Sequence, residues 1–194
     1  MKENQINFPE TVILIDAVLL NAIVKDFKKN FEEMLQRPLQ KMDVAQFVVN
    51  LALDANMPVG NKEIQVIFVY DELAPKLSDS MPSDLKKELN GVAFQDSLGE
   101  FVFASLSLEE MVSREDLYFD LLRIVGESVD VKRVIVVPFE QNNKETIHSA
   151  LEEIKGKEVT LFGMNKPERV ISYSWQLLAY PVMQALGIRG DEMP

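Results

Sequence analysis

Four carboxylates follow apolar runs that are typical of buried strands, and at one edge of a sheet they could do chemistry together. They are Asp16, Asp71, Glu72 and Glu140. Hard divalent cations such as Mg²⁺ and Mn²⁺ prefer oxygen ligands and bind where several carboxylates converge. Carboxylates at strand tips also serve as helix N-caps or as solvated loop residues, so the pattern leaves both interpretations open.

A fifth carboxylate, Asp120, lies in DLYFDLLRIV, which we expect to be a helix. From that position Asp120 could point back toward Asp16 and complete a site for Mg²⁺ or Mn²⁺. An exposed Asp120 that contacts Arg123, three residues further along the helix, is an equally natural arrangement. Asp16 and Asp120 are therefore the candidate metal ligands, and with Glu140 they are the candidate catalytic residues.

The sequence has few of the residues and motifs that other kinds of catalysis require. His148 is the only histidine, and it lies beside the apolar stripe of an expected helix, away from the expected strand tips. The chain has no cysteine, which excludes disulfides, thiolate metal ligands, iron–sulfur clusters and cysteine nucleophiles. The G-x-S-x-G, G-x-G-x-x-G and G-x-x-x-x-G-K-[ST] patterns are also absent, so serine hydrolase, dinucleotide-binding and P-loop signatures are missing.

The elements that position these residues follow from the spacing of apolar side chains. Near-continuous apolar runs predict strands at residues 12–15, 63–72, 100–106 and 131–139, and a fifth strand after Gly156. Helical spacing predicts helices at residues 19–35 and 43–55, a short one at 83–90, one from about 114 to 125, and one around 147–154. Strands that alternate with helices predict a three-layer αβα fold with a doubly wound, mainly parallel, five-stranded sheet. In such sheets ligands bind beyond the carboxyl ends of the strands.

The last apolar stretch, residues 167–188, is expected to be helical and interrupted near Pro181. It has more apolar side chains than one narrow core stripe needs, so two uses stay open. Either the helix packs on the sheet as an outer layer, or it is a surface for partners. A homo-oligomer would then associate through Tyr173, Trp175, Leu178, Tyr180 and Met183. We find no repeat and no linker, and we expect a single domain over residues 1–194 with its core at about 11–164.

The charge balance limits the expected partners. Lys and Arg total 20 against 31 Asp and Glu, which gives a net charge of −11. An anionic surface repels phosphate backbones and anionic lipid headgroups, so we expect no membrane binding and no nucleic-acid binding without a metal ion. The N-terminal residues do not have the pattern of a signal peptide, and we expect a cytoplasmic protein.

Three segments resemble motifs of the NYN branch of the PIN-like nuclease folds. They are VILIDAVLL, DLYFDLL and the strand–helix–strand unit VKRVIVVPFEQNNKETIHSALEEIKGKEVTLFGM, and the similarity of layout covers about residues 11–164. The resemblance implies a metal-dependent ribonuclease site in which Asp16 matches the first metal aspartate and Asp120 an acid of the mid-chain helix. Leu19 stands where the family has asparagine. VVPFEQN lacks the serine, glycine and paired aspartates that the family has there, and Glu140 is a loose substitute.

Three functions therefore stay open. The first is a non-catalytic PIN/NYN-like binding or interaction module. The second is a divergent Mg²⁺-dependent ribonuclease that uses Asp16 and Asp120. The third is a Rossmann-like protein that binds a small ligand at the strand tips.

Overall fold

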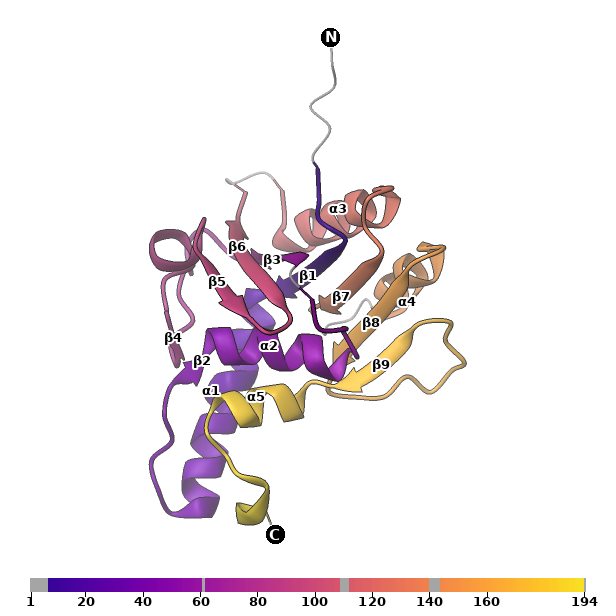
Figure 1. Cartoon of the computed structure of the whole chain (residues 1–194). Helices are drawn as coiled ribbons and strands as arrows, with labels where there is room; N and C mark the ends of the chain where they lie inside the picture. Colours follow the sequence, from indigo (N-terminus) through magenta and orange to yellow (C-terminus); the bar gives the residue numbers. More distant parts are fainter. Residues whose placement is uncertain (1–6, 61, 109–111, 140–143, 194) are drawn as a thin grey trace.

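The computed structural model describes residues 7–60, 62–108, 112–139 and 144–193, and it shows an α/β fold with one large sheet between two layers of helices (Figure 1). The strands are β1 (Thr11–Asp16), β2 (Met42–Asp43), β3 (Lys62–Val69), β4 (Ser80–Met81), β5 (Ala93–Asp96), β6 (Gly99–Leu106), β7 (Arg133–Val137), β8 (Glu158–Gly163) and β9 (Ser174–Leu177). The helices are α1 (Ala17–Leu35), α2 (Val44–Asp54), α3 (Arg114–Glu127), α4 (Lys144–Glu153) and α5 (Ala179–Ala185), with a π-helical turn η1 (Leu85–Leu89) and a 3₁₀ turn η2 (Gly190–Glu192).

The main sheet has seven strands in the order β5-β6-β3-β1-β7-β8-β9. Its neighbours pair in parallel except β5 and β6, which are antiparallel. The central strand β1 pairs with both β3 and β7. The chain builds one half of the sheet outward from β1 through β3 and β6, and then returns to add β7, β8 and β9 on the other side. The two halves therefore diverge at β1 and β7, where sheets wound in two directions place their ligand sites.

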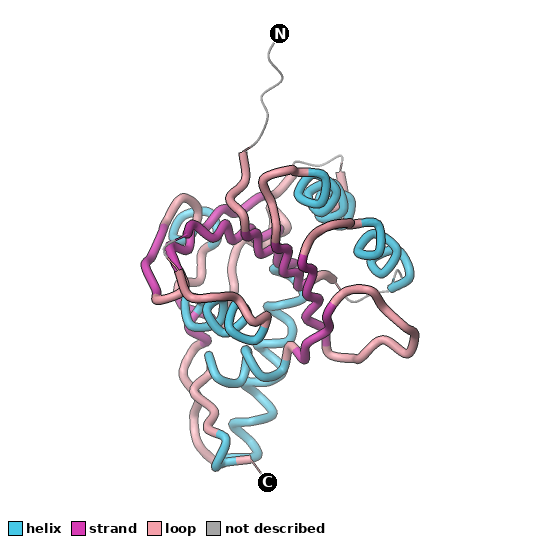
Figure 2. Tube along the Cα trace, turned by 45° about the vertical axis from the view of Figure 1, so that its right-hand side comes forward, coloured by secondary structure: helices cyan, strands magenta, loops and turns pink. Residues whose placement is uncertain are grey.

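Helices cover both faces of the sheet, and each face has its own apolar core. Residues of α1, α2 and α5 pack on one face against inward side chains such as Ile13 and Phe68. Residues of α3 and α4 pack on the other face against side chains such as Leu14 and Val136. Figure 2 shows the twisted sheet between these two groups of helices. The near-continuous apolar runs of the inner strands follow from this arrangement, because each strand is buried on both faces.

The predicted α/β fold with helices on both faces of a mainly parallel sheet is confirmed, but the predicted number of five strands is wrong. The sheet is mixed and has seven strands, because β5 and β9 each add an edge. The strand β5 is short and reaches β6 through a tight turn at Gly99, whose φ is +144°. A Cβ there would lie 2.0 Å from the carbonyl oxygen of Lys62, so this turn requires glycine.

The C-terminal segment does not form the helix predicted for residues 167–188. Residues 164–173 form a loop, β9 joins the edge of the main sheet, and the short helix α5 follows. Pro181 lies in the first turn of α5, where its missing N–H has no helical partner to lose, so it does not interrupt the helix. Beyond α5, Glu192 accepts hydrogen bonds from Nε and Nη2 of Arg37 at 2.8 and 2.7 Å, which ties the end of the chain to the end of α1.

Candidate functional site

The predicted site residue Asp16 is the last residue of β1 and the N-cap of α1. Its Oδ1 accepts a hydrogen bond from the N–H of Leu19 at 2.8 Å, and its Oδ2 lies 2.7 Å from Nε of Arg114. The Asp16 side chain is completely buried, and that of Arg114 is 17% exposed. The helix-cap interpretation of Asp16 is confirmed, and both carboxylate oxygens are engaged within the protein.

The guanidinium of Arg114 supplies the positive charge next to the buried Asp16 carboxylate. Nη1 of Arg114 is also 3.6 Å from Oδ2 of Asp71, so Arg114 links the carboxylate at the end of β1 to one that follows β3. Burial raises the pKa of Asp16, while the N–H of Leu19 and the charge of Arg114 act in the opposite direction. A metal ion needs carboxylate oxygens that are free to coordinate it, and the residues around Asp16 therefore do not fit Mg²⁺ or Mn²⁺.

The other predicted carboxylates do not join Asp16. The Asp120 side chain is 64% exposed and lies 3.8 Å from Nη2 of Arg123, which confirms the local-contact interpretation. Glu72 accepts from Lys86 at 2.7 Å and from the hydroxyl of Ser107. Among the residues that the structure describes, no group of three or more His, Cys, Asp or Glu side chains could hold a metal ion. Glu140 lies outside the described residues.

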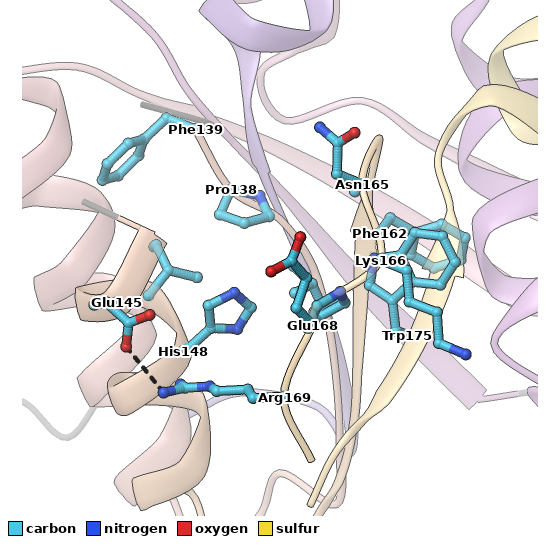
Figure 3. A pocket seen from close by; sticks show the side chains of 14 residues that line it. Pro138, Phe139, Glu145, His148, Phe162, Asn165, Lys166, Glu168, Arg169 and Trp175 are labelled. Atoms are coloured by element: carbon cyan, nitrogen blue, oxygen red, sulfur yellow. Dashed lines mark hydrogen bonds and ion pairs between the residues drawn. The ribbon is translucent and has the colours of Figure 1, made fainter. Parts of the chain in front are cut away.

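An open cavity lies further along the same edge of the sheet, beyond the carboxyl ends of β7 and β8 (Figure 3). Its volume is about 660 Å³, which is within the range of small-molecule sites. Pro138 directly follows β7 and has no N–H to continue the strand pairing, so the chain leaves the sheet at this point. The apolar walls are formed by Pro138, Phe139, Ile147, Leu161, Pro167 and Trp175.

The polar side chains of the cavity come from α4 and from the loop after β8. They are Glu145, His148, Asn165, Lys166, Glu168 and Arg169. A guanidinium nitrogen of Arg169, Nη1, lies 2.9 Å from the carboxylate of Glu145, and Arg169 also contacts the hydroxyl of Tyr173. The formal charges of the lining side chains cancel when the histidine is neutral.

His148 and Tyr173 connect α4 to the segment that leads into β9. Nδ1 of His148 forms a hydrogen bond with the Tyr173 hydroxyl, and the two rings stack with their centroids 6.0 Å apart. Burial raises the pKa of Tyr173 to about 12, so at neutral pH the phenol is protonated and can donate to Nδ1 of a neutral histidine. The pair therefore links His148, which lines the cavity, to the segment that leads into β9.

The predicted oligomer surface is mostly used inside the chain. Tyr173 and Leu178 are buried in the two cores, and Trp175 and Met183 pack against them. Tyr180 alone of the five residues is strongly exposed, at 59%. The outer-layer interpretation of this segment is the one that the packing favours.

The cavity residues were not predicted from the sequence. Four of the polar ones lie in NKPER, residues 165–169, directly after the predicted fifth strand. The rule that ligands bind beyond strand ends applied to this segment as well, and its cluster of charges was the available signal. The helix expected from residue 167 obscured that signal, because it assigned half of the loop to an outer layer.

The structure defines an α/β protein with an open cavity at the carboxyl edge of its main sheet. The chain belongs to a family of unknown function (DUF6621), whose model matches residues 5–193. No curated protein and no solved structure shows significant similarity to the chain. Within the described part of the chain, no helix is both long and apolar enough to span a membrane.

Proposed function

We propose that the protein is a non-catalytic α/β binding domain that holds a small organic molecule in the cavity beyond β7 and β8. The cavity itself carries this proposal. It has the volume of a small-molecule site, it borders the point where the two halves of the sheet diverge, and its walls are apolar with a few polar groups. The engaged carboxylate of Asp16 adds support, because it leaves the neighbouring strand tip without an obvious catalytic group.

A PIN/NYN-like, Rossmann-like ancestry is part of the proposal. It is supported by the aspartate at the end of the central strand β1, by the adjacent β7, and by the helix and strand that follow β7. In this view the fold keeps the position of a nuclease site, while Arg114 now neutralises its first aspartate.

The two alternatives have less support. A Mg²⁺-dependent ribonuclease that uses Asp16 and Asp120 would need two converging carboxylates, and Asp120 is exposed beside Arg123. Association of two copies through the C-terminal segment would depend on Tyr180, since the other four predicted contact residues pack within the chain. RNA cleavage that requires Mn²⁺ or Mg²⁺ and disappears in Asp16→Ala would favour the nuclease over the binding domain.

The test of the binding function uses Trp175, the only tryptophan, which lines the cavity. Its indole N–H gives a single cross-peak in a ¹⁵N–¹H NMR spectrum of the full chain. Three probes of similar size are titrated, namely 2-phenylethanol, 3-phenylpropionate and phenethylamine. We expect at least one of them to shift this cross-peak in a saturable way.

A cavity-filling variant provides the control for this titration. Asn165→Phe places a large side chain on the rim of the cavity, and Asn30→Phe makes the same change on the exposed side of α1. The shift should be lost in Asn165→Phe and kept in Asn30→Phe. If no probe moves the Trp175 signal at millimolar concentration, the binding function is contradicted.

A further inference from the structure

Among the residues that the structure describes, one carboxylate of the cavity, that of Glu168, has no hydrogen-bond or ion-pair partner. If the cavity is the ligand site proposed above, we infer that it recognises an organic cation, namely an amine with an apolar body. Glu168 is then the counter-ion of the amine. The inference deepens the proposed function, because it assigns a chemical class to the ligand of the same cavity.

Glu168 differs from Glu145, the other carboxylate that lines the cavity, which is paired with Arg169. Arg169 is engaged by Glu145 at 2.9 Å and by the hydroxyl of Tyr173. Within the described ranges, by contrast, Glu168 has no hydrogen bond and no ion pair. Figure 3 shows its carboxylate projecting into the space between Pro138 and His148. A carboxylate placed there can accept charge-assisted hydrogen bonds from a bound ammonium group.

The cation in the cavity wall, Lys166, does not compensate Glu168. In Figure 3 the Lys166 side chain runs along the opposite wall beside Trp175, away from the carboxylate of Glu168. The Lys166 side chain is exposed, and a lysine stem can lie on an apolar wall while its ammonium stays in water. The carboxylate of Glu168 and the ammonium of Lys166 therefore lie on different sides of the cavity in Figure 3.

The remaining features of the cavity favour the same ligand. Phe139 and Trp175 supply aromatic surface, and the negative face of an aromatic ring attracts cations. Pro138 and Ile147 add aliphatic surface for an apolar body. The net charge of −11 raises the local concentration of cations around the protein and repels anions.

The test compares the three matched probes on the full chain by titration of the Trp175 cross-peak. Phenethylamine, 2-phenylethanol and 3-phenylpropionate share a phenyl body and differ in charge. We expect phenethylamine to bind on the order of tenfold more tightly than the other two, which is the size of a typical charge-assisted contact. Glu168→Gln should remove this preference. Glu100→Gln, on the exposed face of β6, makes the same change in net charge and should leave the preference intact.

Each outcome decides a different statement. Equal binding of the three probes would overturn the assignment to cations and leave the ligand-binding function in place. Tightest binding of 3-phenylpropionate would instead assign the site to anions held by Lys166. A preference for phenethylamine that survives Glu168→Gln would overturn the role of Glu168. If none of the three probes binds the wild-type chain, the proposed ligand-binding function is contradicted.

Discussion

Two neighbouring regions at the carboxyl edge of the sheet differ in whether their carboxylate has a partner within the described structure. At the tip of β1, a buried carboxylate is enclosed by a helix N–H and by a guanidinium from a distant helix. At the tips of β7 and β8, an open cavity contains a carboxylate without a partner in the described structure. The comparison teaches that the position of an acid at a strand tip does not define a site. What decides is whether the protein's own groups already satisfy that acid.

The largest expected effect on stability comes from removing the cation that pairs with the buried Asp16. Arg114→Ala would leave the buried Asp16 without its cation, and we expect a loss of about 3 kcal/mol in the free energy of unfolding. Urea denaturation measures this loss. Arg123→Ala is the matched control on the same helix, because Arg123 is 61% exposed and its ion pairs should contribute at most about 0.5 kcal/mol. Equal effects of the two substitutions would show that the Asp16–Arg114 pair is not special.

A smaller effect is expected from Tyr118, which connects α3 to the same strand. Its buried hydroxyl donates to the carbonyl oxygen of Leu14 in β1 at 3.0 Å. Tyr118→Phe should lower the free energy of unfolding by about 1 kcal/mol, since one buried hydrogen bond is lost. The exposed Tyr180 provides the control, and Tyr180→Phe should have no measurable effect in the same denaturation experiment.

The contribution of Asp16 to the stability of the protein should depend on pH. Burial raises the pKa of this carboxyl in the folded protein. The folded state then binds the proton more tightly than the unfolded state, whose aspartate pKa is about 3.9. The contribution of Asp16 to stability is therefore fully present below pH 3.9 and is lost as the pH rises through the raised pKa of the folded state.

A comparison of wild type with Asp16→Asn by urea denaturation between pH 3.5 and 7 measures this effect. The asparagine side chain can still cap α1 but does not titrate. The stability of wild type relative to the variant should fall as the pH rises from 3.5 to 7, because the folded wild type loses a proton that it holds more tightly than the unfolded chain does. An increase with pH would mean that the attraction of Arg114 outweighs burial.

The smallest effect on stability is expected from a substitution in the cavity beyond β7 and β8. Glu168 is exposed and has no partner in the described part of the chain, so Glu168→Gln should change the free energy of unfolding by less than about 0.5 kcal/mol. Thermal and urea unfolding of the ligand-free protein measure this change. A loss as large as that of Arg114→Ala would mean that Glu168 has a structural role and would remove the contrast between the two regions.

The sequence predicted the elements whose apolar pattern is long and regular. The central strands and the helices α1 and α2 were found because their burial depends on local periodicity. The strand β9 was missed although Tyr173 and Trp175 alternate with Ser174 and Gln176, which is the period of a strand. The many apolar residues around this short alternation suggested a helix instead.

The sequence predicted that a site would lie beyond the carboxyl ends of the strands, but it did not predict the contacts of Asp16 or the cavity. The cap formed by Asp16 depends on residues three positions apart and could be anticipated, whereas its ion pair joins residues 98 positions apart. No local pattern specifies a contact of that kind. The cavity has the same origin, because its walls come from the ends of β7 and β8, from α4 and from β9, and only the folded sheet brings them together.

The central place of β1 has a consequence for the synthesis of the protein. The ribosome makes β1 before both of its neighbours in the sheet, which are completed only at residues 69 and 137. Until the second of these has left the exit tunnel, one edge of an almost wholly apolar strand has no native partner. Exposed strand edges of this kind pair with other chains. A chaperone that acts on the nascent chain would therefore have to shield this edge until β7 has emerged.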